Sequence, residues 1–236
     1  MPYKGPKIVT IDGPAGAGKS TVAKRLAKEL KLSYLDTGAM YRALTLKAIR
    51  QGADLGSEEA LVALARSTVI DLQNHGAGVK VLLDGKDVSE DIRTIEVTNK
   101  TFHVASAPRV RAIMVEWQRA IGKKDGAVIE GRDVGTVVFP EASYKFYLDA
   151  DLQERSRRRI CELREKGNDV DAQRLTAELK ARDTKDLTRS VGPLKKADDA
   201  VFIDSTHLSI DEVVGEMIKH INAHGSISDS AKHKYG

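Results

Sequence analysis

Short β-branched runs and amphipathic stretches alternate in the first fifty residues. The run 7–11 (Lys-Ile-Val-Thr-Ile) predicts a strand. Apolar residues then recur at helical spacing over about 19–31, which predicts a helix. A second short strand is expected over 33–35, and the polar break at 36–38 can cap a helix that runs to about Gln51. Strand, turn, helix and strand in this order are typical of the opening of a parallel α/β sheet.

The middle of the chain has a different pattern. Two apolar runs, 69–72 and 79–83, flank the turn sequence 74–78 and predict a β-hairpin. A hairpin does not fit easily into a parallel sheet. Residues of about 66–92 are therefore expected to form a small inserted lobe.

After the lobe, the sequence again shows the helix and strand patterns that are typical of a parallel α/β sheet. Helices are expected over about 94–105, 108–122 and 209–223, and strands over 127–129, 145–148 and 200–203. The polar tail 224–236 is predicted to be frayed. The predicted fold class is α/β, with a parallel sheet flanked by helices and a small inserted lobe that contains the hairpin.

Composition narrows the class of protein. The 236 residues are 41% hydrophobic and 31% charged, which is typical of one soluble globular domain. The single Cys161 cannot form an internal disulfide, and this favours a reducing compartment. No apolar run approaches the roughly 20 residues of a membrane span, and the first residues lack a signal-peptide pattern. A cytoplasmic location is expected.

The positive charge of the chain is concentrated in one segment. Residues 151–196 carry 13 Lys/Arg and nine Asp/Glu, an excess equal to the net charge of +4 of the whole chain. A basic field of this kind suits a phosphorylated ligand, although a solvated helix face with ion pairs has the same composition. The total charge is too small to indicate nucleic-acid binding, and no stacking aromatic residues are interleaved with the basic ones.

Residues 13–20 match the pattern G-x-x-x-x-G-K-[ST] in full, after a predicted strand and before a predicted helix. In this P-loop, glycines let backbone N–H groups surround a phosphate, and the helix N-terminus adds its dipole. Lys19 is expected to reach the β- and γ-phosphates of ATP, and the Ser20 hydroxyl is expected to bind Mg²⁺. The residues predicted to hold the nucleotide are Gly13, Pro14, Ala15, Gly16, Ala17, Gly18, Lys19, Ser20 and Thr21.

Two polar clusters follow predicted strands, where ligands bind in open α/β sheets. In the first, 36–42, Thr37 can donate a hydrogen bond and Arg42 can hold a phosphate. A simple helix cap with a surface arginine is the alternative.

The second polar cluster, 130–135, places charged residues and two glycines after the strand 127–129. A solvated turn with an internal ion pair is the alternative there.

The basic segment contains a third cluster. Arg182, Asp186 and Arg189 are spaced so that one helical face presents all three, and Arg155, Arg158 and Arg159 can share a face of the preceding helix. The sequence Lys-Gly-Asn-Asp at 166–169 separates the two helices. An arginine-rich helix pair at a flexible turn can act as a lid that excludes water and neutralises phosphate charge. An ion-paired helix face without such a role is the alternative.

Together these segments resemble the bacterial cytidylate kinases, a family within the P-loop nucleoside monophosphate kinases. The resemblance runs from Ile8 to Thr206. It rests on four stretches: Leu35–Arg42 (LDTGAMYR), Gly131–Pro140 (GRDVGTVVFP), Lys166-Gly167, and Arg182-Asp183 followed by Asp186 and Arg189.

The resemblance implies roles for individual residues. Thr37, Arg111 and Asp133 would contact the cytosine end of the acceptor. Arg42 and Arg132 would hold the acceptor phosphate, and Arg182, Asp186 and Arg189 would meet the ribose and phosphates. The family often has Ser at position 37, where Thr keeps the hydroxyl. Some members have a Ser near the base at the position aligned with Phe102, which cannot make that hydrogen bond.

The resemblance also implies the reaction, in which ATP phosphorylates CMP or dCMP with Mg²⁺ bridging the phosphates of ATP. The acceptor phosphate is already anionic, so catalysis would consist of positioning and charge neutralisation by Lys19, Arg132, Arg158 and Arg189. A kinase for UMP or another small acceptor is one alternative. A nucleotide-dependent switch is another, and the acceptor cluster argues against it.

A single P-loop kinase domain is expected, with a core of about 7–36, 106–150 and 197–223. An acceptor lobe would span about 37–105, and a helical lid about 151–190. The expected partners are the small molecules ATP, CMP and dCMP, with no nucleic acid and no membrane. The chain is expected to be a monomer.

Overall fold

The central sheet has five strands, in the order β2-β6-β1-β7-β8, and every neighbouring pair is parallel. In this computed structural model, which describes residues 7–75, 78–165, 167 and 169–230, the strands are β1 (Ile8–Asp12), β2 (Ser33–Asp36), β6 (Ala127–Gly131), β7 (Tyr144–Asp149) and β8 (Val201–Asp204). β1 lies at the centre, and both β1 and β6 are buried along their whole length. Helices cover both faces, as parallel sheets require.

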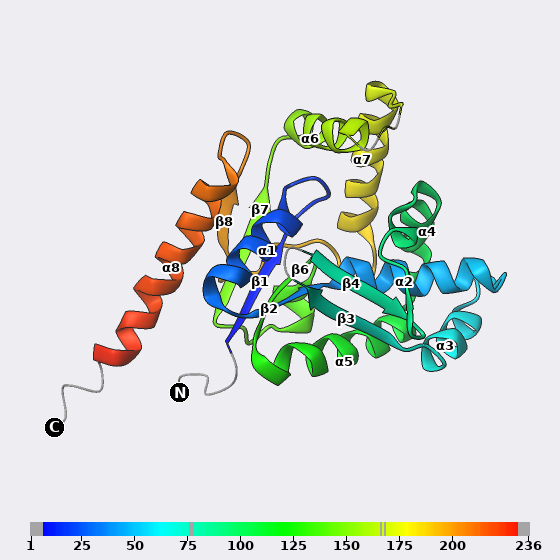
Figure 1. The fold of residues 1–236 in the computed structure, drawn as a ribbon, viewed down its shortest axis with the longest axis horizontal. Coiled ribbons are helices and arrows are strands. Elements are labelled where there is room, and N and C mark those ends of the chain that lie inside the picture. Colours follow the sequence, from blue (N-terminus) through cyan, green and yellow to red (C-terminus); the bar gives the residue numbers. More distant parts are fainter. Residues whose placement is uncertain (1–6, 76–77, 166, 168, 231–236) are drawn as a thin grey trace.

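Alternate residues of the strands enter two hydrophobic cores. Val9 and Ile11 face α1 (Lys19–Leu30) and α8 (Ile210–Ser230), which pack together on one side. Ile8 and Ile129 face the other side, which is covered by α2 (Thr37–Arg50), α3 (Glu58–Arg66) and α5 (Pro108–Asp125). Figure 1 shows α8 along one side of the sheet and the α2–α5 region on the opposite side. This confirms the predicted α/β fold with a parallel sheet flanked by helices.

The predicted hairpin is confirmed as an antiparallel pair, β3 (Ile70–His75) and β4 (Gly78–Leu83), extended by the short β5 (Lys86–Asp87). The turn residues 76–77 lie outside the described part of the chain. Val81 and Leu83 pack against Ala39 and Leu46 of α2, so this small sheet is joined to the main domain through that helix. The turn η1 (Asp91–Arg93) and α4 (Ile95–Ser106) complete the region.

The basic segment forms two helices, α6 (Leu152–Glu165) and α7 (Ala172–Thr188), separated where the sequence predicted a break. They lie beside the β1–α1 loop at one end of the sheet (Figure 1). Both helices are fully described. α6 buries only Arg155 and Ser156, and α7 buries only Leu179. The pair therefore has little apolar packing, in contrast to α1 and α2.

Four features differ from the sequence expectations. α3 was not predicted, although Ser57 caps it and its apolar residues join the core. β6 continues to Gly131, and a π-helical turn, η2 (Val134–Val138), follows it. α8 extends past the expected end at about residue 223 to Ser230, and the frayed tail over 224–236 stays a prediction. Residues 231–236 lie outside the described part of the chain.

Within residues 7–75, 78–165, 167 and 169–230, no helix has the length and hydropathy of a membrane span. The structure does not test the division of the chain into core, acceptor lobe and lid, which stays a prediction.

Candidate active site

The P-loop joins β1 to α1 at the carboxyl edge of the sheet. Gly13 and Gly16 have φ values of 151° and 81°, which L-residues with side chains rarely adopt. A Cβ on Gly13 would also lie 1.9 Å from the carbonyl oxygen of Leu148. Gly18 precedes α1 without any side-chain cap on the helix. The loop sequence therefore follows from its backbone geometry and from close contact with β7.

Lys19 is the central cation of this loop. The residue is only 5% exposed, and Nζ donates a hydrogen bond to the carbonyl oxygen of Pro14 at 2.6 Å. Burial, and then the positive charge of Arg132, lower the pKa of Lys19 to about 7. Ser20 and Thr21, which follow in the helix, are exposed. A buried ammonium group next to a second cation is stabilised by any anion that enters the site.

Glu130, at the carboxyl end of β6, lies beside the P-loop. Its carboxylate accepts a short hydrogen bond from the Tyr34 hydroxyl, and Ser20 is a further hydrogen-bonding neighbour. Burial, followed by the negative charge of Asp36, raises the pKa of Glu130. Sequence reasoning placed Glu130 in a polar cluster but assigned it no role. The usable signal was an acidic residue at the end of a buried strand.

Asp12 is a second buried carboxylate that the sequence analysis missed. It ends β1, directly before the P-loop, and accepts hydrogen bonds from the backbone N–H groups of Val134 at 2.8 Å and Gly135 at 2.7 Å. Burial raises its pKa to about 6, although these hydrogen bonds act in the opposite direction. Asp12 thereby connects the P-loop to the segment that carries Arg132 and Asp133.

A buried group of three charged residues lies at the start of η2. Asp133 forms a short ion pair with Arg111 of α5, and its other oxygen is 3.4 Å from Nη2 of Arg189. Burial raises the pKa of Asp133, and Arg111 opposes that shift. Arg189 also donates to the carbonyl oxygen of Gly192. Residues that are 22 to 78 positions apart in the sequence thus meet in one ionic cluster.

Arg132 connects the same segment to α7. Its Nε donates to Asp186 at 2.7 Å. Burial would raise the pKa of Asp186, but the charge of Arg132 lowers it overall. Burial, and then Arg132, lower the pKa of Arg182 to about 10. Charges of Arg42 and Arg159 also act on Arg182, so several guanidinium groups gather here around Asp186.

The sequence of residues 36–42 allowed either a helix cap or a polar cluster, and the structure contains both. Asp36 caps α2 by accepting from the N–H of Ala39 at 2.8 Å, and it also pairs with Arg42 at 3.0 Å. Arg42 is not a surface residue, because its side chain is only 16% exposed. The Thr37 hydroxyl donates to the carbonyl oxygen of Glu130 at 2.7 Å. Both predicted residues therefore lie next to the end of β6.

The three arginines predicted to share a face of α6 have different surroundings. Arg155 is buried against the P-loop, where its Nη1 donates to the carbonyl oxygen of Ala15. Arg158 donates to Ser205 and to Glu154. Arg159 pairs with Glu162 on its own helix. The spacing i, i+3 and i+4 within α6 agrees with the predicted common face, although the three guanidinium groups have different partners.

Phe102 lies on α4, where the Nζ of Lys185 from α7 is 5.4 Å from the centre of its ring. This contact brings α4 and α7 together across the region between the hairpin lobe and the helix pair. The family resemblance implies that position 102 lies near the base of the acceptor, and this stays a prediction.

Comparison with known proteins identifies a family. Residues 9–223 match the profile of the cytidylate kinase family. The chain is 51% identical to the cytidylate kinase of Desulforamulus reducens over 90% of its length and 95% of the relative's. It is also 51% identical to that of Bacillus pumilus, over 89% and 93%. Among solved structures, a gluconokinase from Sinorhizobium meliloti matches 98% of this chain and 100% of its own, with a TM-score of 0.50 and 12% identity, and shows the fold alone.

Proposed function

The chain belongs to the cytidylate kinase family, and from this we propose that it transfers the γ-phosphoryl group of ATP to CMP and dCMP, yielding ADP with CDP or dCDP. The observation that supports this most directly is that the P-loop, which would hold the donor, and Arg132, which would hold the acceptor phosphate, lie on the same edge of the sheet. The P-loop with Lys19 lies beside Arg132, whose charge acts on the pKa of Lys19. A donor phosphate and an acceptor phosphate would therefore be close together.

The proposed donor site is the P-loop, residues 13–21. Its backbone N–H groups and the start of α1 would surround the β- and γ-phosphates, and Lys19 would exchange the carbonyl oxygen of Pro14 for a phosphate oxygen. The low pKa of Lys19 in the free protein supports this exchange. A bound triphosphate would supply the counter-charge that this buried ammonium group lacks.

The residues around Ser20 fit a Mg²⁺ ion. The Ser20 hydroxyl and the Glu130 carboxylate are neighbours at the edge of the P-loop, and hydroxyl and carboxylate oxygens are ligands that Mg²⁺ prefers. Ser20 would hold the ion directly, and Glu130 would stabilise it directly or through its water. When bound, Mg²⁺ neutralises charge on the β- and γ-phosphates.

For the acceptor we propose the assignment that the family resemblance gave. Asp133, with Arg111 and Thr37, would recognise the cytosine end of CMP. Arg42 and Arg132 would hold its phosphate. The ribose and phosphates would also contact residues at the end of α7: Arg182, Asp186 and Arg189. The ionic cluster of Asp133 supports this assignment, because a carboxylate already held by two arginines is rigid before the base arrives.

Catalysis under this proposal needs no general base, because an acceptor phosphate oxygen is already anionic. Lys19, Arg132, Arg158 and Arg189 would neutralise the charge that develops on the transferred group. Arg158 is close enough for this role, since a Cβ on Gly18 would lie 3.8 Å from its Nη1. A cytoplasmic location and a monomeric state remain part of the proposal.

A coupled assay of ADP release tests the proposed function. CMP and dCMP should stimulate ADP formation strongly, and UMP and the purine nucleoside monophosphates should do so much less. Stimulation mainly by UMP would favour the first alternative, another small-acceptor kinase. ADP formation that no nucleoside monophosphate stimulates would favour a nucleotide-dependent switch.

Asp133→Asn tests the acceptor site in the same assay. The substitution keeps the shape of the side chain but removes the charge that pairs with Arg111 and Arg189. Loss of a hydrogen bond to a charged group corresponds to about a 10-fold or larger loss of CMP affinity. Calorimetry should show weaker CMP binding and unchanged ATP binding, whereas the exposed Asp198→Asn should change neither. Weaker ATP binding with intact CMP binding would contradict the placement.

A further inference from the structure

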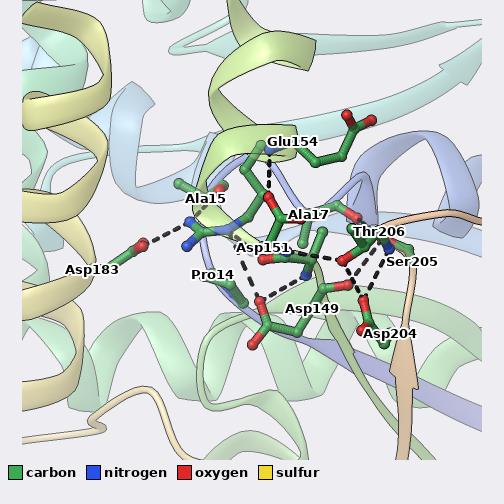
Figure 2. A network of polar contacts seen from close by, with 12 residues as sticks. Pro14, Ala15, Ala17, Asp149, Asp151, Glu154, Asp183, Asp204, Ser205 and Thr206 are labelled. Carbon is green, nitrogen blue, oxygen red and sulfur yellow. Dashed lines mark hydrogen bonds and ion pairs between the residues drawn. The ribbon is translucent and has the colours of Figure 1, made fainter. Parts of the chain in front are cut away.

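Arg155 joins three segments that lie far apart in the sequence. It belongs to α6, and its side chain is only 8% exposed. Nε donates to the carbonyl oxygen of Ala150, at the end of β7, at 2.9 Å. Nη1 donates to the carbonyl oxygen of Ala15 in the P-loop at 3.0 Å and to Asp183 of α7 at 2.7 Å. In Figure 2, Asp183 approaches from α7 on one side and Ala15 lies on the P-loop.

The bond to Ala15 determines which way one P-loop peptide faces. In a trans peptide the C=O and N–H groups point in opposite directions. Because the carbonyl of Ala15 points outward to Arg155, the N–H of Gly16 points to the inner side of the loop. The contact is close, since a Cβ on Gly16 would lie 3.1 Å from the Cβ of Arg155. The outer side of the loop is therefore occupied by α6.

A second peptide of the loop is held in the same manner. The Ser205 hydroxyl lies 3.3 Å from the carbonyl oxygen of Ala17 and 2.9 Å from that of Asp149. Arg158, one turn after Arg155, donates to both the hydroxyl and the carbonyl oxygen of Ser205. Figure 2 shows Ser205 beside Ala17, connected to the segment that follows β8. The N–H of Gly18, opposite the Ala17 carbonyl, also faces inward by the argument given for Gly16.

We propose that Arg155 is a positioning residue for the phosphoryl donor, and that its ion pair with Asp183 makes the shape of the P-loop depend on the placement of α7. Arg155 does not contact the phosphate itself. It acts through the Ala15 carbonyl, which holds the N–H of Gly16 toward the phosphate. This inference rests on the proposed function only in assuming that the P-loop holds the phosphates of the donor.

The ion pair gives α7 a direct connection to the donor site. Asp183 lies between Arg182 and Asp186, which face the proposed acceptor site. A movement of α7 that brings Arg182 and Asp186 to the acceptor also carries Asp183, and with it the bond from Arg155 to Ala15. Donor and acceptor sites are thereby coupled through one guanidinium group with fixed fork geometry.

Calorimetry with inorganic tripolyphosphate tests the role of Arg155, because this probe reports on the P-loop without contacts to a base or ribose. Arg155→Lys keeps the charge but cannot contact all three partners. We expect tripolyphosphate and ATP to bind about 10-fold or more weakly, the loss typical of a charge-assisted hydrogen bond, with CMP affinity within about 2-fold of wild type. In steady-state kinetics the KM for ATP should rise more than the KM for CMP.

Asp183→Asn is the second variant, because it leaves the side chain of Arg155 intact if the lysine variant fails to fold. It should weaken tripolyphosphate binding by about 3-fold, and combined with Arg155→Lys it should add little, since both act through one contact. Arg174→Lys, at an exposed position of α7, is the matched control and should change nothing.

Two results would overturn the inference. One is wild-type affinity for tripolyphosphate in both variants. The other is an equal loss of tripolyphosphate and CMP affinity, which would indicate a general structural role. Both results leave the proposed function standing, as long as the wild-type protein binds ATP and phosphorylates CMP. Failure of the wild-type protein to bind ATP would instead remove the proposed function.

Discussion

Lys19 and Asp12 lie at the two ends of the P-loop, and both are buried with unusual proton affinities. Burial lowers the pKa of Lys19 to about 7 and raises that of Asp12 to about 6. In each case the environment disfavours the charged form of the side chain. Each of the two residues carries a separate prediction.

Lys19→Ala should nearly abolish phosphoryl transfer while leaving the fold intact. The ammonium group would meet negative charge that develops on the transferred phosphoryl group, and removing such a donor costs on the order of 10²-fold or more in turnover. Initial rates of ADP release from ATP and CMP measure the loss. Lys28→Ala, on an exposed part of the same helix, serves as the control. Activity of Lys19→Ala within a few fold of wild type would disprove the phosphate-binding role.

Asp12→Asn should change how stability depends on pH. The pKa of Asp12 is raised from 3.8 to about 6, so the folded protein binds the proton more tightly than the unfolded chain. The cost of burying the charge is therefore fully present above about pH 6 and disappears as the pH falls toward about 4. The asparagine variant lacks this dependence. Between about pH 7.5 and about pH 5, its stability relative to wild type should fall by roughly 1 kcal/mol.

Urea unfolding at both pH values measures the difference, and effects of all other groups cancel because they are common to both proteins. Asp198→Asn, at an exposed carboxylate, should show no comparable change. A stability difference for Asp12→Asn that does not vary with pH would show that the buried carboxylate does not titrate in this range.

At the scale of elements, α6 and α7 contrast with the helices that cover the sheet. α1 and α2 each bury several apolar side chains in the cores. In α7, all of which is described, only Leu179 is buried. Few buried contacts mean low local stability. The polar contacts of Arg132 with Asp186 and of Arg155 with Asp183 then hold α7 to the domain. Bound phosphates would add counter-charge for Arg182, whose pKa is lowered by burial and by the charge of Arg132.

The segment 155–189 should therefore become more protected from hydrogen exchange when ATP and CMP, or a bisubstrate analogue, are added. We expect the largest change in α7, on the order of 10-fold in exchange rate, and little change in α2, which is packed in the core. Exchange followed by mass spectrometry measures both helices in one experiment. Equal protection with and without ligands would mean that α6 and α7 form a static helix face and not a lid.

At the scale of the whole molecule, the described surface offers little apolar area for self-association. The large hydrophobic side chains exposed within the described residues belong to different segments, namely Val69, Ile95, Leu187, Phe202 and Ile210. Isolated exposed residues of this kind are normal for monomeric proteins. Light scattering should therefore give a mass near the 25.8 kDa of one chain. A mass near twice that value at micromolar concentration would contradict a monomer.

The parts of the site that the sequence predicted are those encoded by neighbouring residues. The P-loop is one uninterrupted stretch, and its glycines, Lys19 and Ser20 lie where the pattern placed them. The hairpin was predicted because two apolar runs flank a turn, and the parallel sheet because strand and helix periods alternate. The P-loop and the hairpin each span fewer than about 20 residues, and each strand or helix of the alternating pattern is also read from neighbouring residues, so these signals can be recognised without knowledge of the fold.

Tertiary structure alone decided which buried polar groups meet. Asp12 accepts from residues 122 and 123 positions away, and Arg155 reaches a carbonyl 140 positions earlier in the chain. No periodic pattern in the sequence indicates which of these distant residues will be in contact. The sequence alone does not distinguish Arg155, Arg158 and Arg159 from one another. The packing of α6 against the P-loop gives each of them a different partner. The physical reason is that burial makes an unpaired charge costly, so the partners of a buried arginine are those that the fold brings within hydrogen-bond distance.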